Sequence, residues 1–225
     1  MRHHIATIAL LMALLPLGAH AQRIHAYLNA GFSMNQIEGD ELRGFKKPGL
    51  TAGVGALVRL DERGRWGMSI ETDYAQHGSH STANTSYYLY RLNLTADYVE
   101  VPLLLHYQDP HGGMLVGAGL CYGRLVRQPH GSIGYSPMFF MPDTNDLAFL
   151  GNDFSVVADA RFTIWRGLQL NLRWQHSVLP VKRDWAFYTF KGYEADGEGG
   201  LRERWSTKKN NCYNHSLALR LIWQF

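Results

Sequence analysis

The sequence predicts an all-β fold: an antiparallel, eight-stranded transmembrane β-barrel in up-and-down order, with long external loops. Three observations predict it. Eight segments alternate apolar and polar residues with a period of two, and the connections between them are alternately short and long. After Gln22, no apolar run approaches the ~20 residues that a membrane-spanning helix needs.

The first element is a secretory signal peptide over residues 1–21. A short basic start at Arg2 precedes the apolar run Ile5–Leu17, and Ala19-His20-Ala21 is a small-x-small cleavage site. Cleavage after Ala21 leaves a single barrel domain over residues 22–225. We therefore expect an exported protein in the outer membrane of a Gram-negative bacterium, in contact with outer-membrane lipid.

The expected strands then follow along the mature chain. They are Ala26–Phe32, Leu50–Leu60, Trp66–Tyr74, Leu92–Tyr107, Val116–Tyr122, Phe154–Ile164, Leu168–Trp174 and Tyr213–Phe225. Side chains alternate between the two faces of a strand, so each segment has one apolar and one polar face. The short connections are Asp61–Arg65, Gln108–Gly113 and Trp165–Gly167. The long ones are Asn35–Lys47, Gly78–Arg91, Val126–Asp153 and Ser177–Asn211.

The polar face predicts which side of the sheet points inward. It carries four acidic and four basic residues: Arg59, Glu71, Asp73, Glu100, Asp159, Arg161, Arg173 and Arg220. A soluble lipocalin-like barrel, the alternative, would turn its apolar face inward. Buried ions must be paired or hydrated, and eight strands leave no open channel. We therefore expect a structural charge network in the lumen, with a proton or solute path as the alternative.

Four stretches carry a family resemblance: Leu28–Ser33, Lys47–Val54, Ile70–Gly78 and Tyr98–Leu105. They look like the PorT-like outer-membrane β-barrel family known from Bacteroidetes, and the Tyr-x-Glu-x-Pro-Leu-Leu-Leu strand is the most specific of them. The resemblance implies a barrel and an outer-membrane location, but no established activity. Separately, a last strand that ends on Trp223 and Phe225 resembles the signal read by the barrel-assembly machinery.

Catalytic and metal chemistry find little support in the sequence. The densest histidine cluster, His77-Gly78-Ser79-His80-Ser81, falls on an expected external loop, and no serine can be placed with a companion histidine and acid. No cofactor or metal site is expected. The net charge of only +3 and the lack of a basic block give no support for a nucleic-acid partner. Cys121 and Cys212 are expected near the external end on non-adjacent strands, which leaves a disulfide open.

Two external loops carry apolar residues that suggest a protein partner. These candidate partner-binding residues are Met138, Phe139, Phe140, Met141, Trp185, Phe187, Tyr188 and Phe190. The second loop is expected to form a hairpin above the membrane; packing of both loops over the barrel mouth is the alternative. The sequence thus favours a non-enzymatic structural or interaction protein, as a subunit of a larger envelope or secretion assembly. A barrel enzyme acting on outer-membrane lipid and a narrow solute pore remain alternatives.

Overall fold

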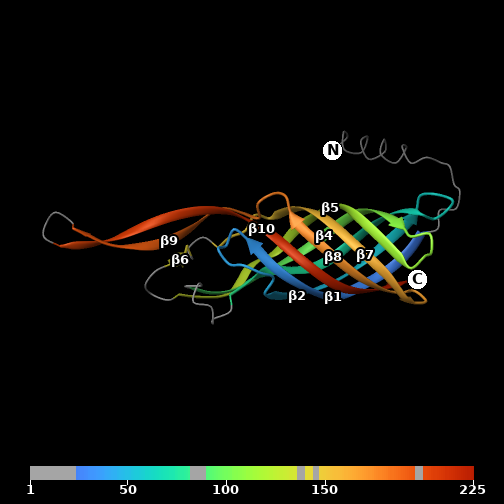
Figure 1. Ribbon diagram of the computed structural model, residues 1–225, viewed down its shortest axis with the longest axis horizontal. Coiled ribbons are helices and arrows are strands. Elements are labelled where there is room, and N and C mark those ends of the chain that lie inside the picture. Colours follow the sequence, from blue (N-terminus) through green and yellow to red (C-terminus); the bar gives the residue numbers. More distant parts are fainter. Residues whose placement is uncertain (1–23, 82–89, 136–139, 144–146, 196–199) are drawn as a thin grey trace, which may run out of the picture.

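The computed structural model describes residues 24–81, 90–135, 140–143, 147–195 and 200–225. These residues form a closed barrel from which one long hairpin projects (Figure 1). The expected signal peptide lies outside the described residues. Within the described part, no helix is long and apolar enough to cross a membrane.

Eight strands close the barrel. They are β1 (Ile24–Glu38), β2 (Lys47–Arg59), β3 (Trp66–His80), β4 (Tyr90–Gln108), β5 (Met114–Tyr135), β7 (Asn152–Trp165), β8 (Leu168–Ser177) and β10 (Leu201–Gln224). Each pairs antiparallel with its neighbour, and β1 pairs with β10 from Tyr27 opposite Gln224 to Glu38 opposite Tyr213. The ring leaves no open edge within it, which confirms the predicted eight-stranded barrel.

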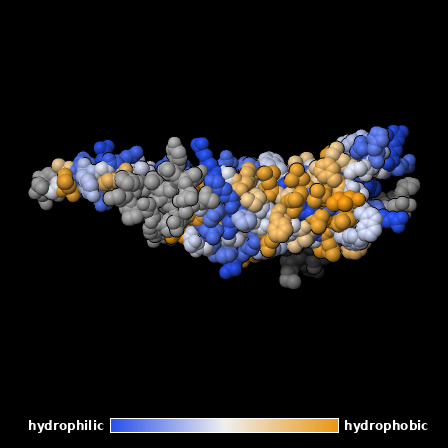
Figure 2. Space-filling view, turned by 60° about the horizontal axis from the view of Figure 1, so that its bottom comes forward, coloured by the Kyte–Doolittle hydropathy of each residue, from blue (hydrophilic) through white to orange (hydrophobic). Residues whose placement is uncertain are grey.

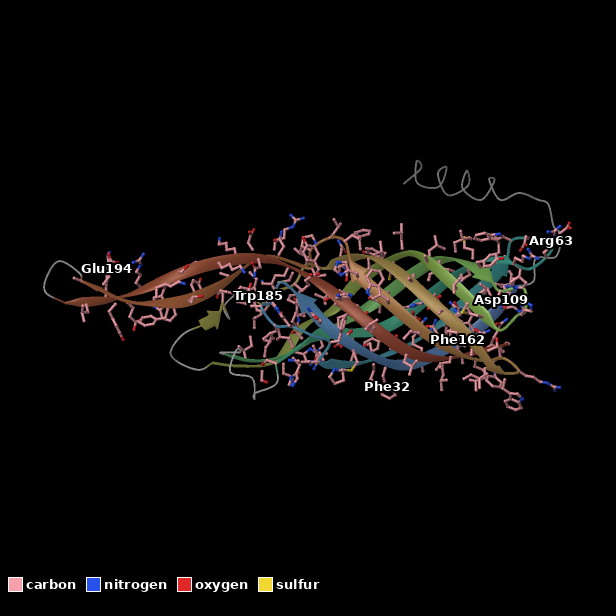
Figure 3. All side chains as sticks on the ribbon, in the orientation of Figure 1. Phe32, Arg63, Asp109, Phe162, Trp185 and Glu194 are labelled. Atoms are coloured by element: carbon pink, nitrogen blue, oxygen red, sulfur yellow. The ribbon has the colours of Figure 1, made fainter. Side chains whose placement is uncertain are left out.

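The apolar face of the barrel points outward. Large exposed apolar side chains come from every strand of the ring, among them Phe32, Ile70, Leu120 and Leu219. Figure 2 shows hydrophobic residues gathered over the barrel between more hydrophilic ends, and Figure 3 shows Phe32 on the outside of the barrel wall. This is the arrangement expected for a barrel in lipid, and it excludes the lipocalin-like alternative.

The two ends of the barrel differ, as predicted. At the short-turn end, β2–β3, β4–β5 and β7–β8 are joined by tight turns that contain Gly64, Gly112 and Gly167. These glycines have φ values of 65°, 78° and 75°, a backbone region that residues with a Cβ rarely adopt. Figure 3 places Arg63 and Asp109 at this end. The opposite end, which carries the longer connections, is called the long-loop end.

At the long-loop end the strands run further than the sequence predicted. β3 continues to His80, β4 already begins at Tyr90 and β5 continues to Tyr135, so the described ends of the expected loops 78–91 and 126–153 include paired backbone. The prediction was wrong there because strands were located by alternation. Beyond the lipid-facing band the alternation fades, with polar residues such as Asn93 and Gln128 exposed, while the backbone pairing continues.

The longest connection forms the predicted hairpin. β9 (Lys182–Ala195) pairs with the first half of β10, and the short strand β6 (Phe140–Pro142) pairs with β9 on its other side. Figure 1 shows this hairpin extending away from the barrel at its long-loop end.

Candidate functional site

The short-turn end of the lumen is closed by an apolar layer. Tyr27, Leu57, Leu115 and Ile222 are buried there and contact one another. Because β5 lies opposite β1 in the ring, the contact of Leu115 with the residues of β10, β1 and β2 carries this layer across the lumen. An apolar layer of this kind excludes water from the charged residues above it.

A central ion network of six charged residues lies next along the barrel axis. Its members are Glu71 and Asp73 from β3, Asp159 and Arg161 from β7, Arg173 from β8 and Arg220 from β10. All six are buried. Three acids face three bases, so formal charges balance, as a lumen shielded from water requires. The sequence placed all six on the inward face, and the structure brings them together.

Glu71 is the centre of this network. Its Oε1 accepts hydrogen bonds from Arg161 Nη2 at 2.8 Å and Arg173 Nη2 at 2.9 Å, and its Oε2 accepts one from Arg220 Nη1 at 3.0 Å. Tyr27 donates a further hydrogen bond to Oε1 at 2.8 Å. A single carboxylate therefore links three strands on the far side of the barrel to β3.

Asp73 and Asp159 complete the network on either side of Glu71. Asp73 Oδ2 lies 3.1 Å from Arg220 Nη1 and 3.3 Å from Arg173 Nη1, and Asp159 Oδ2 lies 3.1 Å from Arg173 Nη2. Asn29 and Asn171 add neutral contacts: Asn29 donates to Asp73 at 2.8 Å, and Asn171 accepts from Arg220 Nε at 2.8 Å. Charged hydrogen bonds with such support are the strong ones in a dry interior.

Glycine makes room for these side chains. A Cβ on Gly53 would collide with the carboxylate of Asp73 and with the backbone carbonyl of Thr72. A Cβ on Gly55 would lie only 2.5 Å from the ring of Tyr27. The glycines on the inward face of β2 therefore leave the space that the side chains of Asp73 and Tyr27 occupy.

A second polar group, the histidine–carboxylate cluster, lies nearer the long-loop end. It consists of His77, Glu100, Asp153, Gln175, Ser177 and Asn214. His77 Nε2 lies 2.7 Å from Glu100 Oε1, and Gln175 donates to the same oxygen at 2.9 Å. Asp153 Oδ2 accepts from Ser177 and from Asn214, each at 2.9 Å.

This cluster corrects two expectations. His77 was expected on an external loop, but β3 extends past it and turns its ring into the lumen. Glu100 was expected in one network with the arginines, but its hydrogen bonds go to His77 and Gln175. The reason in both cases is depth: Glu100 lies further from the short turns than Glu71 and faces the continuation of β3.

The space between the two polar groups is very small. A cavity of about 20 Å³ is lined by residues of both, including Asp73, Glu100, Arg173 and Arg220. That volume is enough for about one water molecule. The filled cross-section leaves no room for a solute at this level of the barrel.

Arg59 also lies outside the central ion network that the sequence predicted for it. It is half-buried at the short-turn end, where its guanidinium donates to the carbonyl of Gly64 at 2.9 Å and to Gln108 at 3.3 Å. The sequence placed Arg59 on the inward face of its strand, the face that also carries the buried Leu57. However, it sits at the last position of β2, so it closes the rim of the barrel instead of joining the carboxylates inside.

The lumen contains a serine, a histidine and an aspartate in series, an arrangement that the sequence did not predict. Ser69 Oγ lies 2.7 Å from His106 Nε2, and His106 Nδ1 lies 3.6 Å from Asp159 Oδ1. The second distance is too long for a hydrogen bond. Ser69 and His106 are buried, and Arg161 also approaches Ser69 Oγ at 3.5 Å. A substrate has no path to this serine through the packed interior described above.

The long-loop mouth of the barrel is covered by an apolar cap. The cap is the buried cluster Ile37, Leu42, Leu92, Leu94, Ala96, Tyr98, Phe149, Val181, Trp185, Phe187 and Cys212. Figure 3 shows Trp185 where the hairpin joins the barrel. Trp185 also donates a hydrogen bond from Nε1 to the carbonyl of Asp143 at 3.0 Å. The lumen is therefore closed at both ends among the described residues.

The cap contains two of the residues that were predicted to bind a partner. Trp185 and Phe187 are only 1% and 0% exposed, so they pack over the barrel mouth and do not form a partner surface. Tyr188 and Phe190, further along the hairpin, are half-buried. Met138 and Phe139 lie outside the described residues, whereas the backbone of Phe140 and Met141 forms β6. In loops no periodicity distinguishes a core aromatic residue from a surface one.

The two cysteines were expected together near the external end, but Cys121 packs with Leu104 and Val157, apart from the cap that contains Cys212. Cys121 and Cys212 are both buried and both free, so no disulfide joins them. Asp40, in the β1–β2 connection, is buried, and this burial raises its pKa to about 7 although Ser79 and the backbone N–H of Leu42 donate hydrogen bonds to it. Asp40 is therefore an acid outside the lipid-facing band that can gain or lose its proton near neutral pH.

The final strand places the expected assembly residues at the short-turn end. The side chains of Trp223 and Phe225 are exposed on the outside of the barrel. The backbone N–H of Phe225 donates to the carbonyl of Ala26 at 2.9 Å, which holds the chain end against β1.

Comparison with known proteins places this architecture in a family. The family model described as "Outer membrane protein beta-barrel domain" matches residues 7–225. No curated protein sequence matches the chain significantly.

Solved structures resemble the fold at low sequence identity. The attachment invasion locus protein Ail of Yersinia pestis is 9% identical over 89% of this chain and 98% of its own, with a TM-score of 0.44. Neisserial surface protein A is 11% identical over 89% of this chain and 97% of its own, also at 0.44. A major outer membrane protein of Thermus thermophilus is 12% identical over 92% of this chain and 100% of its own, again at 0.44.

Proposed function

Since the chain belongs to the outer membrane protein β-barrel domain family, we propose that it is a non-conducting, non-enzymatic barrel of the Gram-negative outer membrane that binds an envelope protein through its projecting hairpin. The observation that carries this proposal is a sealed barrel with a long hairpin at one end. A filled lumen offers no route for solutes, so a function must be sought on the outer surface.

The hairpin has the features of an interaction surface. Its outer part carries an aromatic group in which the ring of Phe190 lies 5.3 Å from the rings of Tyr193 and Trp205. Tyr193 and the nearby Leu201 are 65% and 72% exposed. Exposed apolar and aromatic side chains together favour a protein contact, and Tyr and Trp are the residue types enriched in such contacts.

The wider setting follows from the family and the sequence. In outer-membrane barrels the long connections face outward and the short turns face the periplasm, so the hairpin would point away from the cell. Export by a signal peptide, recognition of Trp223 and Phe225 by the barrel-assembly machinery, and membership of the PorT-like group with a place in an envelope assembly are parts of this proposal.

The hairpin role can be tested by crosslinking in native membranes. A partner held by the aromatic group should give a crosslinked species with wild type that is lost in a Phe190→Ser/Tyr193→Ser/Trp205→Ser variant. The matched control is Arg63→Ser/His111→Ser, which changes exposed residues at the opposite end. An unchanged set of crosslinked species in the hairpin variant would refute the role.

Absence of a pore is tested separately. The wild-type protein in planar lipid bilayers should give no ion current above background, because the central network and both apolar layers fill the lumen. A stable conductance step would show that the lumen is an open path.

The Ser69–His106–Asp159 series is the one observation that favours the enzyme alternative. A fluorophosphonate, which labels nucleophilic serines, distinguishes the enzyme from the non-enzymatic barrel. We expect no labelling of the folded protein, since Ser69 Oγ is sealed in the lumen and shared with Arg161. Labelling that disappears in Ser69→Ala would identify an esterase-type site instead.

A further inference from the structure

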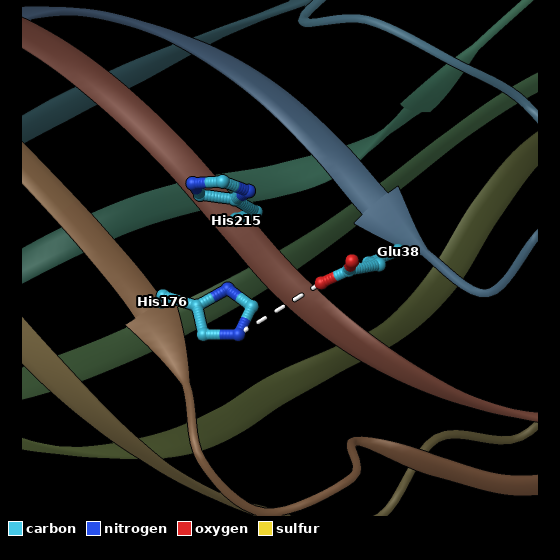
Figure 4. A group of neighbouring side chains, drawn as sticks. All are labelled: Glu38, His176 and His215. Atoms are coloured by element: carbon cyan, nitrogen blue, oxygen red, sulfur yellow. Dashed lines mark ion pairs between the residues drawn. The ribbon is translucent and has the colours of Figure 1, made fainter.

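Three potential metal ligands meet on the outside of the barrel at its long-loop end. Glu38 comes from the end of β1, His176 from β8 and His215 from β10. One ligand atom from each lies within 4.8 Å of the others. Figure 4 shows the carboxylate of Glu38 facing the ring of His176, with the ring of His215 beside them.

The strand pairing explains why these residues converge. His215 and His176 are direct cross-strand partners on β10 and β8. On the other side of β10, Gln36 is the direct partner of His215, and Glu38 lies two residues further along the same face of β1. Directly opposed residues such as His176 and His215 have Cβ atoms about 5 Å apart, and a diagonal neighbour such as Glu38 lies about 7–8 Å away, within reach of a long side chain.

From this geometry we propose that Glu38, His176 and His215 form a binding site for a divalent transition-metal cation such as Zn²⁺. Two imidazoles and one carboxylate are a set that Zn²⁺ uses, with a fourth position left to water. Imidazole nitrogen also selects transition metals over Mg²⁺ and Ca²⁺, which prefer oxygen ligands. The three side chains are partly exposed, so an ion can reach them from outside the membrane.

The three ligand atoms lie within 4.8 Å of one another, and the His176–Glu38 pair requires only a small adjustment to hold an ion. His176 Nε2 and Glu38 Oε2 are 3.8 Å apart, whereas two ligands of a tetrahedral Zn²⁺ are about 3.4 Å apart. The side chain of Glu38 is 57% exposed at the end of a strand, so it can close this gap without disturbing the core. The two histidines are held by paired strands and by aromatic neighbours.

Trp174 supplies an independent indicator of binding. Its Nε1 donates a hydrogen bond to His215 Nε2 at 2.7 Å, and its ring stacks on His176 with an interplanar angle of 12°. A cation on His215 Nε2 would replace this hydrogen bond. A cation on Nδ1 would move the ring proton to Nε2 and break it as well. In either case the environment of the indole changes.

The test uses the full chain, purified from membranes in detergent without an added polyhistidine tag. Zn²⁺ is titrated by calorimetry into wild type, His176→Gln and His111→Gln. His111 is the matched control because its side chain is exposed at the short-turn end, 3.7 Å from Asp109. We expect His176→Gln to bind Zn²⁺ at least about tenfold more weakly than wild type and His111→Gln to match wild type.

Tryptophan emission gives a second readout. Zn²⁺ should change the emission of wild type, Mg²⁺ should not, and the change should be absent in Trp174→Phe. If His176→Gln loses the heat-modifiable mobility of the folded barrel, Glu38→Gln replaces it, since it alters an exposed side chain. Equal Zn²⁺ affinity in wild type and the ligand variants, or no Zn²⁺ binding by wild type, would overturn the proposal.

Discussion

Arg220→Leu should destabilise the folded barrel far more than the loss of an exposed charge. Arg220 is buried and donates to Glu71 at 3.0 Å, to Asp73 at 3.1 Å and to Asn171 at 2.8 Å. Leucine replaces the aliphatic part of the side chain but none of these contacts. Three acids would then face two arginines, so one negative charge would lack compensation in the lumen.

The size of the effect follows from what stays in place. Removing one partner of a buried ion pair costs about 3–5 kcal/mol. Arg161 and Arg173 still contact Glu71, and Arg173 still contacts Asp73, so the lower end applies. We expect the free energy of unfolding to fall by about 3 kcal/mol. Lys208→Leu breaks only an exposed pair with Glu41 and should cost less than about 1 kcal/mol.

Urea unfolding in phospholipid vesicles, followed by tryptophan fluorescence, measures both changes. Arg220→Leu/Asp73→Asn supplies the internal check, because it restores equal numbers of acids and bases while keeping the shape of residue 73. It should recover much of the loss. Equal small effects of Arg220→Leu and Lys208→Leu, or a double variant no more stable than the single one, would mean that water screens the lumen and that the network does not stabilise it.

Three further expectations follow from the described contacts. Gly53→Ala should destabilise by about 1–3 kcal/mol in the same assay, because its Cβ collides with Asp73, whereas Gly113→Ala, which meets open space, should not. Burial raises the pKa of Asp40 from 3.8 to about 7, so the folded state binds this proton more strongly than the unfolded state. The free energy of unfolding of the wild type should therefore fall relative to that of Asp40→Asn as pH rises from about 4 to about 7, by at most about 1.4 kcal/mol per pH unit. Parallel plots of unfolding free energy against pH for the two proteins would contradict this. Phe225→Ser should lower the amount of protein in the outer-membrane fraction while the refolded barrel unfolds as wild type does, because the side chain is exposed; normal membrane levels would count against an assembly signal.

The sequence predicted the barrel well because period-two alternation reports directly on a wall between lipid and lumen. It assigned Glu71, Asp159, Arg161 and Arg220 to the inward face from parity alone, and the structure places each of them there. It could not predict which acid meets which base. Those contacts cross the barrel between strands that are not neighbours, and they depend on the stagger of the whole ring.

Other residues were misplaced or missed for local reasons. The alternation of β1 places the side chain of Tyr27 inside the barrel. Nothing in the sequence, however, indicates that its hydroxyl donates a hydrogen bond to Glu71. His77 was assigned to a loop because the alternation ends before the strand does. Trp185 and Phe187 belong to a cap whose partners come from distant segments, so nothing near them in the sequence marks them as core.

The charged inner face also explains how strands with so many apolar residues keep one register. A shift of a strand by one residue exchanges its two faces. On β3 such a shift would turn Glu71 and Asp73 toward lipid and bring Ile70 into the lumen. On β8 and β10 it would turn Arg173 and Arg220 outward, at about 2–4 kcal/mol for each arginine near the middle of the membrane. Apolar residues on both faces would carry no such penalty, so several registers would compete. The ion network therefore specifies the pairing that aligns His176 with His215 and sets the hairpin above a closed barrel.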